Sequence, residues 1–298
     1  MKSKPLILTI VGAIVLIAIF TLASNDDSTP TPVSESKQQL TLSDVHGLEV
    51  AIDDPDKLYL PNHQGLYSQE ADGIMEKIGS ISDDFMGFAV SPSEPSVFYA
   101  SGHPKTGGNF GVISTSDGGT SWEDISEGLD GPVDFHTMAI DNADDQLIYG
   151  YYRGALQRSL DRGASWQYLE NAPDQIIQLS AGSSEGQLYV STVSGLYVSS
   201  DNGETWKLID SLPGTITAVE INPTNSTIFA YSVNRGLVIS EDKGETWSEV
   251  DRSSSYGQVL YIASSKLDPQ QVYFVTKALE IYESTDGGKT WRTRNQDA

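Results

Sequence analysis

The octet "SSDNGETW", residues 199–206, decides the fold because it recurs along the chain at near-constant spacing. Its pattern is Ser/Thr-x-Asp-x-Gly-x-Ser/Thr-Trp, and every tryptophan of the chain is the last residue of one copy. These tryptophans follow one another at steps of 44, 40, 41 and 44 residues. Five matches at this period indicate a repeat architecture. The copies are TSDGGTSW (115–122), SLDRGASW (159–166), SSDNGETW (199–206), SEDKGETW (240–247) and STDGGKTW (284–291).

Each repeat also contains four short strand candidates, which we name A, B, C and D. They are apolar or alternating runs separated by Asn, Asp, Pro and Gly, and the octet is the turn between C and D. An earlier, worn copy lies at 46–78, where Ala71 replaces the Asp, Glu76 replaces the Trp and Gly73 is retained. Six four-stranded units of about forty residues predict an all-β fold, a six-bladed β-propeller over residues 40–298. A linear β-solenoid is the alternative, although its repeats are usually shorter. Whether residues 40–42 add a closing strand stays open.

The octet is expected to have a structural role. Its Asp can accept hydrogen bonds from nearby backbone N–H groups, its Gly allows a backbone conformation closed to other residues, and its Trp is expected to start strand D and to be buried between sheets. A calcium loop is the alternative, but the EF-hand spacing that ends in Glu at position 12 is absent. The predicted structural residues are Asp117, Trp122, Asp161, Trp166, Asp201, Trp206, Asp242, Trp247, Asp286 and Trp291.

The N-terminus predicts export. Lys2 and Lys4 precede an unbroken apolar run from Leu6 to Ala23, and positive charge before such a run places the remainder outside the membrane. Residues 1–23 are therefore expected to be an uncleaved membrane anchor or a cleaved signal segment, and either would make the protein extracytoplasmic. Residues 24–39 are rich in Ser, Thr and Pro and are predicted to be a flexible linker.

Composition excludes several functions. The formal net charge of -23 repels phosphate backbones, so nucleic acid is not an expected partner. The chain has no cysteine, which excludes disulfides, thiolate metal ligands and a thiol nucleophile. It also excludes a lipid-modified cysteine, so any membrane attachment must use the chain itself.

The octet resembles the Asp box, or BNR repeat, of sialidases and other glycoside hydrolases. The resemblance covers the five octets and, by the repeat frame, residues 44–295. The segments VHGLEV (45–50) and HQGLY (63–67) are similar to those of exported bacterial propellers described as glycosyl hydrolases. Sortilin-type receptor domains and the photosystem II assembly factor carry the box too. In all of these it is a fold element far from the active face, so the resemblance implies architecture rather than chemistry.

Strand parity predicts where a ligand would bind. Consecutive antiparallel strands alternate in direction, so the A–B and C–D turns share one face of the ring and the B–C and D–A turns share the other. All four histidines fall at B–C or D–A positions, on the face opposite the octets. Asp and His two residues apart, as in Asp44-Val-His46 and Asp134-Phe-His136, should point the same way. The loop 101–111 is long enough to overhang this mouth of the channel. The predicted ligand-binding residues are His46, His63, His103, His136, Tyr152 and Arg153, and the positional catalytic candidates are Asp44, Asp84 and Asp134.

Three functions fit this pattern. A glycoside hydrolase or carbohydrate-binding propeller would use the carboxylates, histidines and tyrosine. A non-enzymatic scaffold, like the sortilin-type and assembly-factor proteins, would bind an exported or membrane protein. A metal-binding exported protein would hold a divalent metal at the histidines, and otherwise no cofactor is expected. Sialidases use a Tyr nucleophile and three arginines, and their Phe/Tyr-Arg-Ile-Pro segment is absent here, so sialidase activity is not expected.

Overall fold

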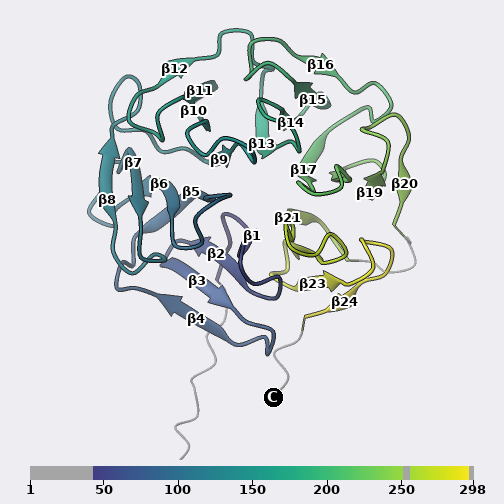
Figure 1. Cartoon of the computed structure of the whole chain (residues 1–298), viewed down its shortest axis with the longest axis horizontal. Coiled ribbons are helices and arrows are strands. Elements are labelled where there is room, and N and C mark those ends of the chain that lie inside the picture. Colours follow the sequence, from purple (N-terminus) through teal and green to yellow (C-terminus); the bar gives the residue numbers. More distant parts are fainter. Residues whose placement is uncertain (1–42, 251–255, 295–298) are drawn as a thin grey trace, which may run out of the picture. The chain divides into compact units, whose positions relative to one another are not determined.

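The computed structural model describes residues 43–250 and 256–294 and shows a β-propeller of six four-stranded antiparallel blades in sequence order around a ring (Figure 1). The compact unit that contains the ring spans Gln39–Ala298. The predicted N-terminal segment (1–23), the linker (24–39) and the closing-strand candidate (40–42) lie outside the described residues. No helix in the described ranges is long and apolar enough to cross a membrane.

Within each blade the strands follow the order A, B, C, D from the channel outward (Figure 1). Strand A packs against strand A of the next blade from β5 through to β21, and β1 meets β21 where the ring closes. Between blades 1 and 2, β5 packs mainly against β2. The blades are β1 (Glu49–Val50), β2 (Leu58–Asn62), β3 (Gly65–Gln69) and β4 (Met75–Ile78); β5 (Asp84–Val90), β6 (Phe98–His103), β7 (Val112–Thr115) and β8 (Glu123–Ser126); β9 (Thr137–Ile140), β10 (Ile148–Tyr152), β11 (Ala155–Ser159) and β12 (Gln167–Tyr168); β13 (Ile176–Ala181), β14 (Leu188–Thr192), β15 (Leu196–Ser199) and β16 (Lys207–Leu208); β17 (Ile216–Ile221), β18 (Ile228–Ser232), β19 (Gly236–Ser240) and β20 (Ser248–Glu249); and β21 (Val259–Ser264), β22 (Val272–Thr276), β23 (Ile281–Ser284) and β24 (Arg292–Thr293).

Each Asp box closes the C–D turn with its own side chains. In the third box, Ser199 Oγ donates to Asp201 Oδ1 (2.7 Å) and accepts from the Gly203 N–H (2.9 Å). The Thr205 N–H donates to Asp201 Oδ1 (2.9 Å), and its hydroxyl donates to Oδ2 (2.6 Å). The other four boxes repeat these bonds. Both carboxylate oxygens are thus used inside the turn, which supports the structural role over a calcium loop.

The boxes also dock each blade onto the one before it. The Gly203 backbone lies so close to blade 3 that an added Cβ would be 2.5 Å from Leu169 Cδ1. Equivalent approaches occur in the other boxes; Gly244, for example, lies against Ile209 of blade 4. Because φ is +86° at Gly203, the position favours glycine for its conformation as well as for its small size.

The tryptophans differ from expectation in two respects. Strand D begins at the residue after each Trp, and the rings are half-buried rather than fully buried. Trp122, Trp166 and Trp291 pack on core phenylalanines, as in the 4.9 Å centroid distance between Phe135 and Trp166 and the 4.5 Å distance between Phe274 and Trp291. Each indole is partly exposed to solvent because strand D is the outermost strand of its blade.

Blade 1 joins blade 6 without a complete box. Its C–D turn is shorter, and the Gln69 side chain donates to the Gly73 carbonyl (2.9 Å) in place of the box network. Met75 packs in one core cluster with Tyr273 and other residues of blade 6. The hydroxyl of Tyr273 donates to the Pro55 carbonyl (2.9 Å), which adds a polar contact across the same junction.

Candidate functional site

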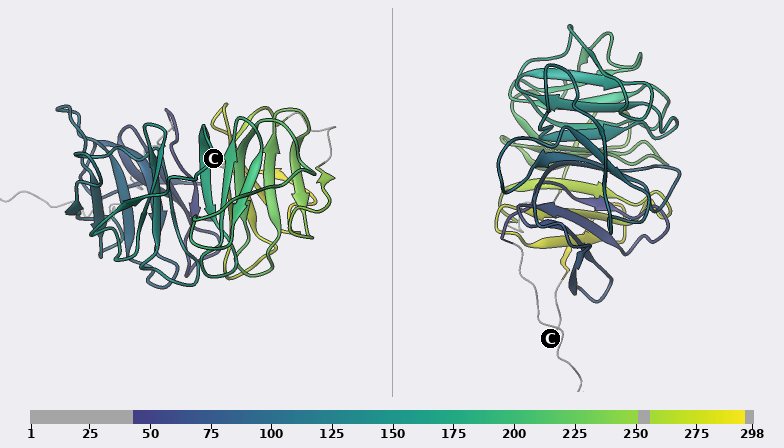
Figure 2. Two further views of the ribbon diagram at one scale, coloured as in Figure 1. Left: turned by 90° about the horizontal axis from the view of Figure 1, so that it is seen from above. Right: turned by 90° about the vertical axis from the view of Figure 1, so that its left-hand side faces the viewer.

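The two faces of the ring are formed by different sets of turns, and the edge-on view in Figure 2 shows the strands running between them. The boxes bond to the A–B turns of their own blades, as when the Asn202 N–H donates to the Gly186 carbonyl (2.9 Å). The other face carries the B–C turns and the starts of strands A. His63 lies in the β2–β3 turn, and His46 precedes β1, so both lie on this second face, which we call the site face.

Asp84 is the centre of a cluster on the site face. It starts β5, is 7% exposed, and is the direct cross-strand partner of His103 at the end of β6. Asp84 Oδ2 lies 2.5 Å from His63 Nδ1 and 3.6 Å from His103 Nε2, and Oδ1 lies 3.1 Å from His46 Nδ1. Three imidazoles from blades 1 and 2 therefore surround one buried carboxylate.

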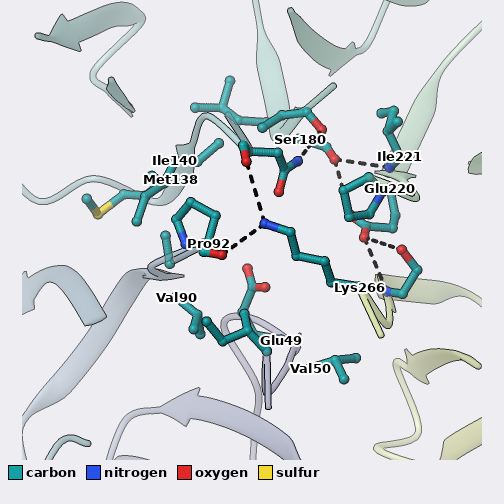
Figure 3. A pocket seen from close by; sticks show the side chains of 18 residues that line it. Glu49, Val50, Val90, Pro92, Met138, Ile140, Ser180, Glu220, Ile221 and Lys266 are labelled. Atoms are coloured by element: carbon teal, nitrogen blue, oxygen red, sulfur yellow. Dashed lines mark hydrogen bonds between the residues drawn. The ribbon is translucent and has the colours of Figure 1, made fainter. Parts of the chain in front are cut away.

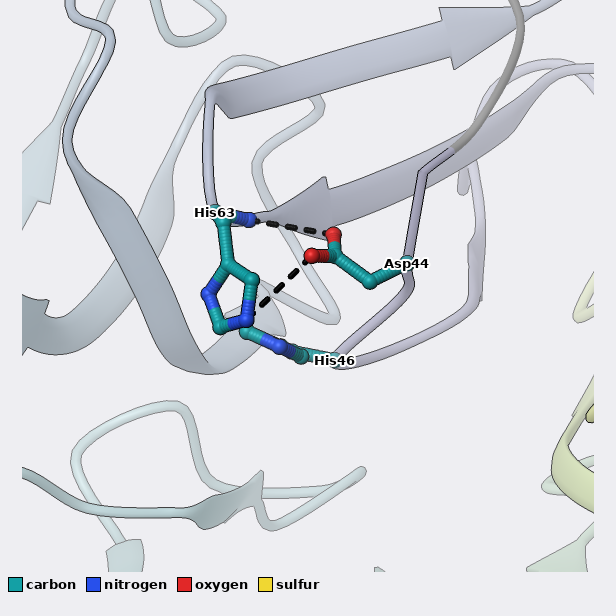
Figure 4. A group of neighbouring side chains, drawn as sticks. All are labelled: Asp44, His46 and His63. Atoms are coloured by element: carbon teal, nitrogen blue, oxygen red, sulfur yellow. Dashed lines mark hydrogen bonds and ion pairs between the residues drawn. The ribbon is translucent and has the colours of Figure 1, made fainter.

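His63 links Asp84 to a second carboxylate. Its Nε2 lies 3.2 Å from Asp44 Oδ2, and its backbone N–H donates to Asp44 Oδ1 at 3.2 Å (Figure 4). The His46 and His63 rings meet edge to face with centroids 4.3 Å apart. Asp44, His46 and His63 each offer one ligand atom, and these atoms lie within 4.8 Å of one another. Mixed imidazole and carboxylate groups at this separation can share protons or hold a transition-metal ion.

The fourth histidine belongs to blade 3. His136 Nε2 lies 3.2 Å from Asp134 Oδ2, so the two residues point the same way, as their spacing predicts. The hydrogen bond to Asp134 raises the pKa of His136, with burial opposing and the charges of Asp134 and Asp84 adding to the rise. Protonation of His136 is therefore favoured on a mostly acidic surface.

Tyr152 and Arg153 extend the site face across blade 3. The Arg153 guanidinium lies over the Tyr152 ring at 4.9 Å from its centroid. The loop predicted to overhang the mouth reaches the same place, since Asn109 Nδ2 donates to Tyr152 Oη (3.0 Å) and to the Pro132 carbonyl (2.8 Å). This loop therefore joins blade 2 to blade 3 beside the cluster.

The three catalytic candidates do not stand as free carboxylates. Asp44 and Asp84 share His63, and Asp134 is bonded to His136. A glycosidase needs one carboxylic acid and one carboxylate on opposite sides of a sugar bond. Here each of the three candidates is instead bonded to a histidine.

Two further carboxyl groups lie in the channel, and the sequence reading missed them. In the described part of the chain, the channel contains two pockets, one lined by Lys266 and the other by His46 and His136. Glu49 and Glu220 line both of them. Burial raises the pKa of Glu49 to about 8, with the Glu220 charge adding to the effect. Burial raises the pKa of Glu220 to about 7, against hydrogen bonds from Ser264 and Ser180. At neutral pH the pair thus favours holding a proton.

An alignment of the six repeats at strand A reveals Glu49 and Glu220 as exceptions. The backbone bonds that close the A–B turns place Glu49, Ala89, Ala139, Ser180, Glu220 and Ala263 at one repeat position. A charged residue where other blades carry Ala or Ser indicates an unusual channel group. Lys266 reaches across this end of the channel from blade 6 and donates to the Pro92 carbonyl at 2.9 Å (Figure 3).

Comparison with known families agrees with this geometry. The BNR/Asp-box repeat model matches residues 197–208, which contain the third octet, and the model described as Sortilin, neurotensin receptor 3 matches residues 235–298. The chain is an Asp-box β-propeller. A search of curated protein sequences found no match.

Solved structures share the fold of this Asp-box propeller at low identity. A GH74 xyloglucanase from Xanthomonas campestris is 16% identical with a TM-score of 0.59; the alignment covers 84% of this chain and 47% of that one. The structure "YCF48 bound to D1 peptide" is 17% identical with a TM-score of 0.56, covering 86% of this chain and 83% of that one. A chain of a Nidogen/Laminin complex is 12% identical with a TM-score of 0.59, covering 80% and 92%. This chain therefore spans about half of the xyloglucanase, and the likeness concerns the fold alone.

Proposed function

We propose that the protein is an extracytoplasmic, membrane-attached propeller scaffold that binds an exported or membrane protein through its site face. The observation that carries the proposal is that the two faces of the ring differ in how their polar side chains are used. The Asp carboxylates of the box face are used within their own turns, whereas the site face presents His63, His136 and Arg153 with more than a third of each residue exposed. Exposed charged and aromatic groups on turns of a rigid ring are typical of binding surfaces.

The structural neighbours support a scaffold role. The alignment with this chain covers most of the peptide-bound YCF48 chain and most of one chain of the Nidogen/Laminin complex. In both of these structures a propeller of similar size is found with a peptide or protein partner, and we expect the same class of ligand here. Attachment rests on Lys2, Lys4 and the apolar run 6–23, which would anchor the chain in the membrane and place the propeller outside.

A carbohydrate is the second candidate. It is favoured by Glu49 and Glu220, because a carboxylic acid that keeps its proton near neutral pH can act as a general acid. The xyloglucanase neighbour shows that the fold occurs in a carbohydrate-active enzyme. A panel of soluble glycans tested by thermal shift on the full chain would separate the candidates, with Glu49→Gln as the matched variant.

Site-specific photocrosslinking in intact cells tests the main proposal. A photoreactive amino acid is placed at Gln64 or Arg153 on the site face, and at Lys243 or Lys289 on the box face as controls. All four positions are exposed. The proposal predicts one protein adduct of constant mass from both site-face positions and none from the controls. Adducts from the box face alone would overturn it.

A further inference from the structure

We infer that Asp44, His46 and His63 bind one zinc ion, with Asp84 as the carboxylate that orients the His63 imidazole and the Phe85 carbonyl as the group that orients His46. The inference deepens the proposed function, since the ion would lie on the site face beside the partner surface. Three side chains from two different segments of blade 1 converge here (Figure 4). Asp84 comes from β5 of blade 2.

The hydrogen bonds fix which ring nitrogen of His46 carries its hydrogen. Nδ1 of His46 lies 3.1 Å from the Phe85 carbonyl oxygen and 3.1 Å from Asp84 Oδ1. Both oxygens only accept, so Nδ1 carries the hydrogen, and Nε2 of the neutral ring presents a lone pair.

The same reasoning applies to His63 and exposes a conflict. Its Nδ1 lies 2.5 Å from Asp84 Oδ2 and therefore carries a hydrogen. Its Nε2 then presents a lone pair toward Asp44 Oδ2, only 3.2 Å away, where another lone pair faces it. A cation between these two atoms would be held by both lone pairs, and the Asp44 and His63 ligand atoms lie close enough together for one ion.

A metal ion resolves the conflict with the pattern seen at protein zinc sites. Metal-bound histidines commonly donate their other N–H to a carboxylate, and Asp84 accepts from the cluster in that way while 7% exposed. The 3.2 Å between His63 Nε2 and Asp44 Oδ2 is close to the roughly 3.4 Å expected between two ligands of one tetrahedral zinc. Hard Mg²⁺ and Ca²⁺ prefer oxygen-only sets, so two imidazoles and one carboxylate favour a transition metal, and zinc binds this ligand set in three-ligand sites with one open position.

The site has room for a fourth ligand. The His63 side chain is 55% exposed and that of Asp44 is 24% exposed, so the cluster opens toward solvent on the site face. Three protein ligands and one open position are typical of zinc sites that bind water or an incoming group. A carboxylate or imidazole from a partner could occupy that position.

Cobalt substitution and zinc titration test the inference on the full chain purified in detergent. After chelation and removal of the chelator, one equivalent of Co²⁺ should give the visible absorption of a four- or five-coordinate site, and Zn²⁺ should abolish it. Asp44→Asn and His63→Asn should each lose this spectrum. His136→Asn, on the same face but outside the set, should keep it. Asp84→Asn should keep the stoichiometry but weaken zinc binding by about 10–100-fold.

The outcomes separate the two proposals. No cobalt spectrum in the folded wild-type chain, or an equal spectrum in Asp44→Asn, overturns the zinc inference and leaves the cluster as a set of His–Asp contacts without a metal ion. Asp44 is half-buried and its replacement is isosteric, so this variant keeps the test valid even if His63→Asn fails to fold. Crosslinks from Gln64 and Arg153 that persist in chelator would uphold the site face without zinc. Zinc binding with adducts from the box face alone would overturn the proposed function but not the metal site.

Discussion

At the scale of single residues, carboxyl groups in this ring fall into two opposite environments. The box aspartates accept several hydrogen bonds each, which lower the pKa values of Asp117, Asp201 and Asp242 to about 2, with the Ser or Thr hydroxyl as the largest cause. The channel glutamates Glu49 and Glu220 are instead half-buried, and burial raises their pKa values to about 8 and about 7. Stability should therefore respond to pH in two separate windows.

The first window is acidic. A carboxyl group whose pKa is lower in the folded state than its usual 3.8 stabilises the fold above 3.8, and this contribution is lost as the pH falls through about 2. We expect the free energy of unfolding in urea to fall steeply between pH 4 and 2. Asp201→Asn should start less stable at pH 6 but lose less over this window. Parallel curves for the wild type and Asp201→Asn would contradict the assignment.

The second window belongs to Glu49. Its folded pKa of about 8 lies above the usual 4.5, so folding takes up a proton between these values and stability falls as the pH rises through them. Glu49→Gln should therefore have little effect at pH 4 and should stabilise the protein increasingly toward pH 8, by up to a few kcal/mol. Urea titrations of both proteins at pH 4, 6 and 8 measure this. A gain that does not depend on pH would count against a buried carboxyl group.

At the scale of elements, the C–D turn both closes its own blade and docks it onto its neighbour. Gly203 and Gly236 make a matched pair for separating these roles. Both have positive φ, +86° and +78°, but a Cβ at Gly203 would be 2.5 Å from Leu169 while nothing lies within 4 Å at Gly236.

Alanine at both glycines should therefore cost stability for different reasons. Gly236→Ala should lose only the backbone term, about 1 kcal/mol. Gly203→Ala should have the same backbone cost and must also displace Leu169. Its free energy of unfolding should therefore fall by at least about 1 kcal/mol more than that of Gly236→Ala. Urea unfolding of the two variants gives the difference directly, and equal losses would mean that the box does not clamp the preceding blade.

At the scale of the whole molecule, the sequence predicted the ring better than the site. Five octets at a fixed period, together with the worn copy at 46–78, were sufficient to predict six blades and the two faces, because strand alternation is a local rule. Packing between blades is not local. The sequence placed Asp84, His46 and His63 on the same face, but it did not predict that their side chains are in contact. The sequence did not predict the half-burial of the tryptophans, because strand D is the exposed edge of each blade. It did not predict Glu49 and Glu220 either, because a glutamate in a strand is usually exposed and only the closure of the ring places these two in the channel.

The central claim is that the boxes hold the ring while the site face binds. The most direct test compares Trp206→Ala with His63→Asn, measuring urea stability and the crosslinking yield from position 153 in each. Because its ring is half-buried, Trp206→Ala should lose about 2–3 kcal/mol of stability but keep its yield per folded molecule. His63→Asn should stay folded at physiological temperature and lose most of the yield. A Trp206→Ala variant that remains as stable as the wild type but fails to crosslink, beside a His63→Asn variant that unfolds, would contradict the account.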